Sequence, residues 1–154
     1  MTAPPYTHDG FHPAFAALAE RIVADRAAAW PAMIAAGTLD NVGADRRLFI
    51  MRAIAEIWRC ATDPSLTPQK RYMAVSRTEC LEELARAVEA AERRLQRKPD
   101  DRGRQLQRDQ LIAMRWWHGR YATKAYALNM LLMLRFDALQ LQLGDGASNE
   151  RTAA

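Results

Sequence analysis

Cysteine is scarce in this chain, and long apolar runs are missing. The two cysteines, Cys60 and Cys80, both stand within helical apolar patterns, so we expect small, reduced, buried side chains rather than a disulfide framework. The start, MTAPPYTHDGFHP, has no basic region followed by an apolar run. Nowhere do about 18 apolar residues follow one another, the length that crosses a membrane. These absences predict a cytoplasmic protein without membrane contact.

Catalytic motifs are also missing. The sequence has no Gly-rich phosphate loop, no Glu-x-x-His pair and no serine or cysteine beside a histidine. His8 and His12 flank Asp9 but have no third ligand nearby, so we interpret them as incidental. Neighbouring carboxylates such as Glu82 and Glu83 alternate with arginines, as on a solvent-facing helix. We therefore predict no enzyme, no catalytic residue, no metal and no cofactor.

The segments that remain have helical periodicity throughout. With 49% apolar and 26% charged residues, the composition is typical of a globular protein, and 154 residues suffice for one domain. We predict an all-α fold, an antiparallel helical bundle of four to five helices with a long C-terminal helical hairpin. Residues 1–12 would form an N-terminal arm, residues 13–143 the single domain and residues 144–154 a polar tail.

The first two helices are bounded by proline and glycine. The first should begin near Pro13, be kinked or divided at Pro31 and end at Gly37. The second should run from about Ala44 to Ala61. Its expected core stripe consists of Ile50, Met51, Ile54, Ile57 and Trp58.

The last two helices should form the hairpin. Thr67 is the expected N-cap of the third helix, with Pro68 in its first turn, and the helix should end at Lys98 and Pro99. A fourth helix, capped by Asp100 or Asp101, would run to Gly144 and exceed forty residues. One apolar stripe should follow it: Met114, Trp117, Tyr121, Ala125, Leu128, Leu132, Leu139 and Leu143.

Positive charge concentrates on this hairpin. Residues 93–124 include ten basic and three acidic residues, whereas the rest of the chain has 12 basic and 15 acidic ones. Such a local field suits a polyanion, although a solvated face would have the same composition. The candidate nucleic-acid-binding residues are Arg93, Arg94, Arg97, Lys98, Arg102, Arg104, Arg108, Arg115, Trp116, Arg120 and Lys124.

Aromatic residues interrupt the basic segment. Trp117 falls on the apolar stripe and should be buried, whereas Trp116 would share an exposed row with Arg120 and Lys124 at four-residue steps. That row could stack on a base and bind the next phosphates, or Arg120 could simply cover the indole. A lone histidine, His118, is more often structural than chemical.

Residues 130–134 (Met-Leu-Leu-Met-Leu) are apolar on every side of their helix. A helix tolerates this only when neighbours surround it. Together with Leu139, Leu141 and Leu143, the segment predicts burial against a second copy or another protein subunit, unless the helix is internal.

One short segment resembles a known family. Residues 29–43, AWPAMIAAGTLDNVG, resemble a passage of helix, Pro-x-x-Ile, glycine and Leu in the small helical subunits of CRISPR effector complexes, over about a tenth of the chain. The resemblance implies a non-catalytic, all-helical antiviral subunit that stacks in copies along a guide–target duplex and holds nucleic acid by its backbone. The sequence departs from that pattern at the turn, where Ala36-Gly37 replaces Asn-Gly.

Two functional hypotheses follow. The first is a non-enzymatic helical subunit of a larger ribonucleoprotein that binds the backbone of RNA or DNA. The alternative is a protein-interaction regulator or inhibitor encoded by a mobile element, with no nucleic-acid contact.

Overall fold

The chain folds as a helical bundle, and the predicted all-α class is confirmed. In a computed structural model, the described part comprises residues 13–152, with side chains for 14–140; the predicted N-terminal arm, with His8 and His12, lies outside it. No strand occurs in the described range. The elements are α1 (Pro13–Ala35), α2 (Asn41–Thr62), the 3-10 helix η1 (Lys70–Ala74), α3 (Arg77–Arg97), α4 (Arg102–His118) and α5 (Tyr126–Thr152).

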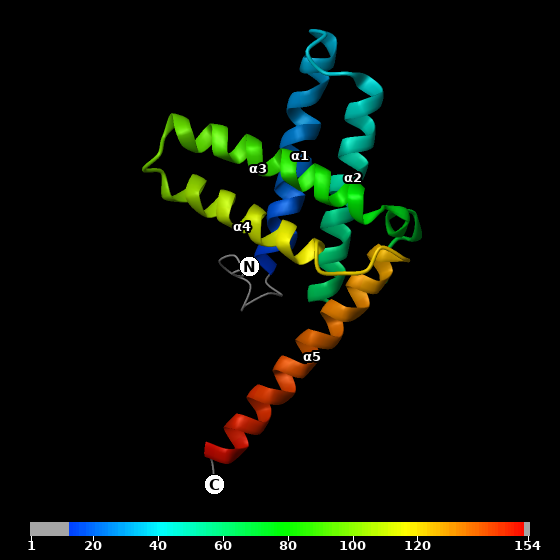
Figure 1. Cartoon of the computed structure of the whole chain (residues 1–154), viewed down its shortest axis with the longest axis vertical. Coiled ribbons are helices and arrows are strands. Elements are labelled where there is room, and N and C mark those ends of the chain that lie inside the picture. The colour runs from blue at the N-terminus through cyan, green and yellow to red at the C-terminus, as the bar shows by residue number, and fades with distance from the viewer. Residues whose placement is uncertain (1–12, 153–154) are drawn as a thin grey trace.

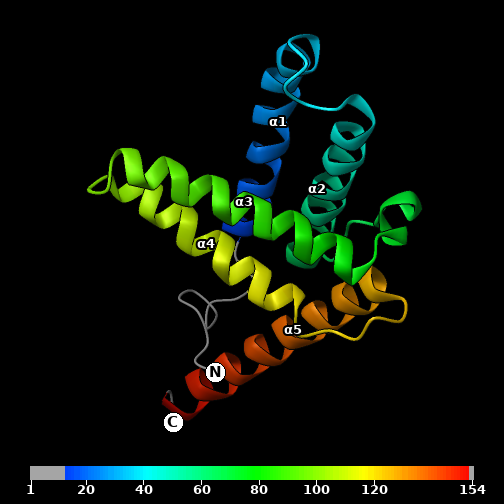
Figure 2. The same ribbon diagram turned by 45° about the horizontal axis from the view of Figure 1, so that its top comes forward.

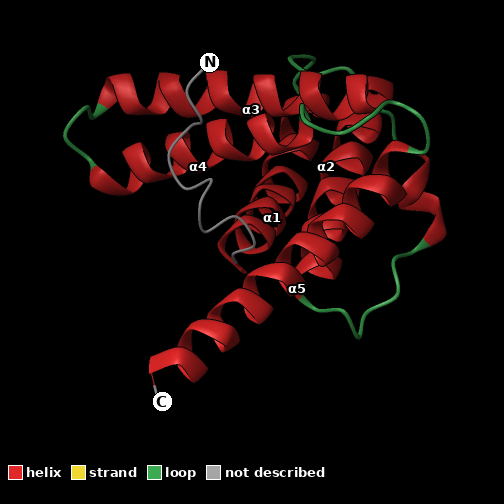
Figure 3. Ribbon diagram, turned by 60° about the horizontal axis from the view of Figure 1, so that its bottom comes forward, coloured by secondary structure: helices red, strands yellow, loops and turns green. Residues whose placement is uncertain are grey.

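The helices form two antiparallel pairs and an arm. Helices α1 and α2 lie side by side, and the α3–α4 hairpin crosses them (Figures 1 and 2). Helix α5 begins against the bundle and extends away from it (Figure 3). The core centres on Trp58 of α2, whose ring meets Phe15 of α1 edge-on at 4.9 Å. The predicted core stripe of α2 is confirmed, because all five of its residues are buried.

The turn between α1 and α2 follows from two local signals. Gly37 has a φ of +74°, a left-handed conformation that glycine adopts without strain. Its N–H bonds the Ile34 carbonyl at 3.1 Å and the Thr38 N–H bonds the Met33 carbonyl at 3.0 Å, a Schellman motif that confirms the predicted end. Division of α1 at Pro31 was wrong: the helix continues through this exposed proline. Solvent can hydrate the carbonyl that the proline leaves unbonded.

The N-cap of α3 lies nine residues after the predicted cap, Thr67. Ser76 is the N-cap, and its hydroxyl accepts from the Glu79 N–H at 3.1 Å while the Glu79 carboxylate accepts from the Ser76 N–H at 3.1 Å. This reciprocal capping box satisfies two donors at once, which Thr67 and Pro68 cannot do. Residues between them turn through η1, and buried Tyr72 fixes that segment to the core.

The α3–α4 hairpin is confirmed, but the single helix of more than forty residues was wrong. Asp101 caps α4, as predicted, by accepting from the Arg104 N–H at 3.1 Å. The helix then ends at His118, and the carbonyl of the capping Gly119 accepts a hydrogen bond of 2.6 Å from Arg77 of α3. After a loop that contains Ala125 at a φ of +47°, α5 runs through Gly144 to Thr152.

Only one side of the first part of α5 is buried. Met130, Leu131 and Leu134 lie in the core, whereas an apolar face remains exposed at Leu128, Leu132, Met133, Phe136 and Leu139. The continuous stripe predicted from Met114 to Leu143 was therefore wrong, because α4 and α5 are separate helices. The side chains of Leu141 and Leu143 lie outside the described ones.

Arg135 joins α5 to the end of α2. Its guanidinium donates to the Cys60 carbonyl at 2.9 Å and to the Leu66 carbonyl at 2.6 Å. Carbonyls at a helix C-terminus lack intrahelical donors, so a cation suits this position. Both cysteines are free and buried, as predicted. Among the described helices, none combines the length and hydropathy needed to cross a membrane.

Candidate nucleic-acid interface

Three of the predicted cations lie at the tip of the α3–α4 hairpin. Arg97 and Lys98 end α3, and Arg102 begins α4 after a short loop. All three are exposed, and their side chains form no ion pair or hydrogen bond within residues 14–140. Arg102 stands where the helix already presents positive N–H groups, so its charge does not stabilise α4.

Two predicted cations next to the tip are partly neutralised. Arg104 donates to the Arg94 carbonyl and its Nε lies 3.6 Å from Asp101 Oδ2. Arg108 is bonded through NH2 to Asp109 at 3.0 Å. The Arg104 bond to Arg94 links the two helices, and the aspartates shield the charges of Arg104 and Arg108. The two guanidinium groups are therefore less available to a polyanion than unpaired ones.

Four of the predicted residues, Arg115, Trp116, Arg120 and Lys124, lie at or beyond the opposite end of α4. Arg102 and Arg115 are thirteen residues apart, roughly 20 Å along the helix. The Arg120 guanidinium lies 4.5 Å from the ring centre of Trp116 and 4.8 Å from that of Trp117, so Arg120 covers the half-buried indole of Trp116. Of the two interpretations of Trp116, the local cation–π contact is the one present.

The predicted exposed row does not exist, because α4 ends before it is complete. Lys124 lies in the loop before α5 rather than one turn beyond Arg120, although it is exposed. Trp117 is buried, as predicted. The structure therefore divides the candidate residues into a group at the hairpin tip and a second group, Arg115, Trp116, Arg120 and Lys124, near the start of α5.

His118 is a structural residue at the core. The Trp58 indole donates to its Nε2 at 3.0 Å, its Nδ1 bonds the Tyr126 hydroxyl, and that hydroxyl also donates to the His118 carbonyl at 3.1 Å. Because Nε2 accepts, the neutral ring carries its proton on Nδ1. Burial lowers the pKa of His118 to about 3.

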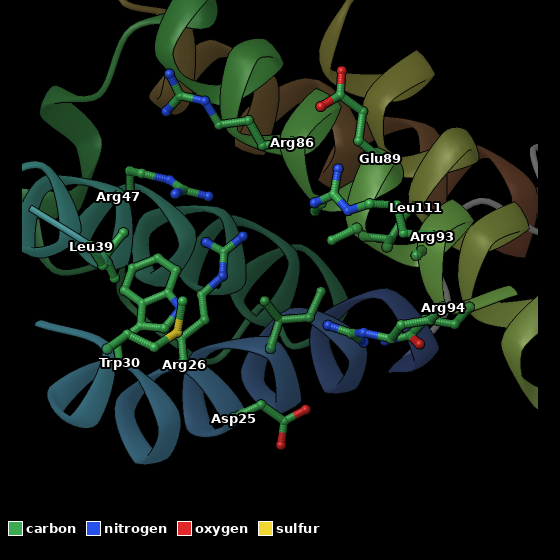
Figure 4. A pocket seen from close by; sticks show the side chains of 16 residues that line it. Asp25, Arg26, Trp30, Leu39, Arg47, Arg86, Glu89, Arg93, Arg94 and Leu111 are labelled. Carbon is green, nitrogen blue, oxygen red and sulfur yellow. The ribbon is translucent and has the colours of Figure 1, made fainter. Parts of the chain in front are cut away.

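A cleft beside the hairpin contains cations that sequence reasoning missed. It has a volume of about 370 Å³ and lies between α1, α2 and α3, with Gln107 and Leu111 of α4 at one side. Figure 4 shows side chains from these helices directed toward the same space. Five arginines line the cleft: Arg26, Arg47, Arg86, Arg93 and Arg94. Only Arg93 and Arg94 belong to the basic segment identified in the sequence.

The carboxylate of Glu83 lies beneath three of these arginines. Glu83 Oε1 accepts from Arg26 at 2.7 Å, and Oε2 accepts from Arg47 at 3.1 Å and lies 3.5 Å from Arg86. Its side chain is 1% exposed, so the predicted solvent-facing position was wrong for this residue. The tertiary fold brings Arg26 and Arg47 to it from 57 and 36 residues away.

Trp30 holds two of the guanidinium groups in place. The Arg26 and Arg47 groups lie 4.8 and 5.0 Å from the centre of its ring, within cation–π distance. Burial lowers the pKa of Arg26, Glu83 opposes this effect, and the charges of Arg47 and Arg94 lower the pKa further. The five arginines outnumber the carboxylates of Asp25, Glu89 and Glu83, so positive charge is in excess at the cleft.

No family model, curated protein or solved structure matches the chain. Within the described residues, no group of three or more His, Cys, Asp or Glu side chains is placed to hold a metal ion. Residues 29–43 form the end of α1, the Gly37 turn and the start of α2. Trp30 belongs to this segment and lines one wall of the cleft.

Proposed function

We propose that the protein is a non-enzymatic helical subunit of a ribonucleoprotein that binds the backbone of RNA or DNA. Binding takes place on a basic face, which we define as the side chains of Arg93, Arg94, Arg97, Lys98 and Arg102. The supporting observation is that these five neighbouring cations are exposed and have no side-chain partner within residues 14–140.

The arrangement of the basic face favours an external anion. Arg93 and Arg97 are four residues apart on α3, as are Arg94 and Lys98, so like charges occupy adjacent positions on the helix surface. Such pairs destabilise a helix unless an opposite charge lies nearby. Cations at the end of α3 gain some stability from the helix dipole, but Arg102, at the start of α4, does not. Phosphate groups would neutralise all five.

Guanidinium groups suit phosphate because they donate two parallel hydrogen bonds to its oxygens. Contacts of this kind position a strand without reading its sequence. The exposed apolar face of α5, defined above from Leu128 to Leu139, supports membership of a larger complex, since patches of this kind commonly mark protein interfaces.

A salt titration tests the proposal. Binding of labelled single-stranded RNA and duplex DNA would be measured by fluorescence anisotropy for the natural protein and for Arg97→Gln/Arg102→Gln. A matched control, Arg21→Gln/Arg52→Gln, removes the same charge from exposed positions of α1 and α2 that do not line the cleft.

The variant Arg97→Gln/Arg102→Gln should bind nucleic acid more weakly and show a shallower dependence of log affinity on log salt concentration. Each lost phosphate contact reduces the slope by about 0.7 for a single strand or 0.9 for a duplex. The control should keep the natural slope. Negligible binding at low salt, or equal slopes for both variants, would contradict the proposal.

A protein partner without nucleic-acid contact is the second candidate, and the apolar face of α5 is the observation that favours it. A folded partner should depend on a few anchoring side chains, such as Phe136, whereas a polyanion should lose affinity gradually with each cation removed. Alanine substitution of Phe136 should leave RNA affinity unchanged if the basic face binds backbone. A loss of RNA binding in Phe136→Ala, with an intact fold, would favour an interface that includes α5.

A further inference from the structure

The cleft between α1 and α3 collects arginines around one space, which a surface for the nucleic-acid backbone does not need. We propose that it binds the terminal phosphate of a nucleic-acid strand, a phosphomonoester, with Arg93 and Arg94 at its mouth and Arg26 and Arg47 at its base. The proposal rests on the proposed function, because the basic face brings the strand to the cleft.

Charge complementarity supports a terminal phosphate. Five arginines at the cleft stand against three carboxylates, namely Glu83 beneath them and Asp25 and Glu89 in the lining, which leaves a net charge of +2. A phosphomonoester carries a charge of about −1.5 to −2 at pH 7, whereas a phosphodiester within a strand carries a single negative charge. The monoester matches the cleft more closely.

Hydrogen-bond donors remain available for it. Glu83 is bonded to one nitrogen each of Arg26 and Arg47, and a guanidinium group has several further N–H donors. Arg93 and Arg94 make no side-chain ion pair or hydrogen bond within residues 14–140. In Figure 4 both extend from α3 into the cleft, toward the side on which Arg26 lies. The free donors thus surround one space from two helices.

The base of the cleft is prepared in advance. Glu83 and Trp30 fix the guanidinium groups of Arg26 and Arg47, so an incoming anion does not need to order them. Binding to a preordered site costs less conformational entropy. The repulsion among Arg26, Arg47 and Arg94 is also relieved when an anion enters.

The depth of the cleft favours a strand end over an internal phosphate. The Arg26 side chain is only 11% exposed, and buried Ile22 and Leu111 form adjacent walls. An internal phosphate needs room for the chain on both sides, whereas a terminal phosphate enters with its sugar behind it. The volume of about 370 Å³ exceeds that of one phosphate group, and Met33 and Leu39 provide apolar contacts for the sugar that follows.

Paired oligonucleotides test this proposal. Short single strands of one sequence, with a phosphate or a hydroxyl at the 5′ or 3′ end, would be compared by fluorescence anisotropy at fixed ionic strength. The natural protein should prefer one phosphorylated strand about tenfold, as expected for a few additional charge-assisted hydrogen bonds. Millimolar inorganic phosphate or a nucleoside monophosphate should abolish the preference; stronger competition by the nucleotide would indicate contact with the sugar.

Two variants separate the cleft from the tip. Arg93→Gln/Arg94→Gln changes exposed side chains that have no partner within residues 14–140 and should remove the preference for the phosphorylated strand. Arg97→Gln/Lys98→Gln removes the same charge one turn further along α3 and should weaken both strands equally, which preserves the preference. Urea denaturation of both variants would confirm that the fold is intact.

The outcomes distinguish this inference from the proposed function. If phosphorylated and hydroxyl strands bind equally well, the terminal-phosphate site is wrong and backbone binding stands. A preference that survives in Arg93→Gln/Arg94→Gln also overturns it, because the phosphate then binds elsewhere. If neither strand binds at low salt, both proposals fail. A preference lost only in the cleft variant supports the site.

Discussion

Acidification should destabilise the protein through one buried side chain, His118. Its ring is fully buried, its Nε2 accepts a hydrogen bond from the Trp58 indole, and its Nδ1 is occupied by Tyr126. A second proton would have to be placed on Nε2, where it would face the N–H of Trp58. Protonation therefore breaks the bond that joins α2 to the end of α4 and leaves a buried charge without a counter-ion.

The size of the effect follows from the difference between the two pKa values. Burial lowers the pKa of His118 to about 3 in the folded protein, against 6.5 for the unfolded chain. Below pH 6.5 the unfolded state binds a proton that the folded state does not, so stability is full at higher pH and is lost as the pH falls from 6.5 toward 3. Between pH 7 and pH 5 the loss is about 2 kcal/mol. A domain of this size would lose roughly 4–8 °C in Tm.

Urea denaturation at pH 7 and pH 5, followed by tryptophan fluorescence, measures this loss. The control is His118→Gln, whose amide oxygen can accept from Trp58 but does not titrate in this range. Its free energy of unfolding should change by about 2 kcal/mol less between the two pH values than that of the natural protein. Equal changes in the two proteins would refute the argument, as would an NMR spectrum in which His118 is protonated at pH 5.

Three further results are expected. Replacing Arg135 by Met should lower the free energy of unfolding by about 2 kcal/mol in urea titrations, because the carbonyls of Cys60 and Leu66 lose a charged donor; a change below about 0.5 kcal/mol would show that solvent replaces it. Glu83→Gln should destabilise by about 3–5 kcal/mol, as expected when one partner of a buried ion pair is removed, and added sulfate should restore more stability to this variant than to the natural protein. Equal responses to sulfate would mean that the arginines are not accessible to anions. Leu132→Asp should reduce any concentration-dependent association in light scattering without lowering the Tm, since this side chain is 52% exposed; a natural protein that remains monomeric at all concentrations would remove the case for self-association.

Local signals in the sequence predicted the ends of α1, α2 and α3, but neither the start of α3 nor the break between α4 and α5. The apolar periodicity and Gly37 were sufficient to predict the positions of α1 and α2, and Asp101 was sufficient to predict the start of α4. The break between α4 and α5 has only a weak local signal, a single glycine without a proline. Tertiary contacts lie on both sides of it: Arg77 of α3 bonds the Gly119 carbonyl, and His118 bonds Tyr126 across the break. Neither contact can be inferred from spacing, because each depends on how the hairpin packs.

At the candidate site, the sequence likewise shows where cations are concentrated but not which of them are available to a ligand. The basic segment located the hairpin tip correctly as a concentration of cations, but a count of charges treats Arg104 and Arg97 alike, although of these two only Arg104 is bonded among residues 14–140. Conversely, Arg26 and Arg47 lie in unremarkable parts of the sequence and become a cluster only because α1 and α2 cross the hairpin beside Glu83. Whether a cation is available to a ligand depends on its tertiary neighbours. The cations with no partner in the described part of the chain, rather than the densest run, are therefore the ones to substitute first.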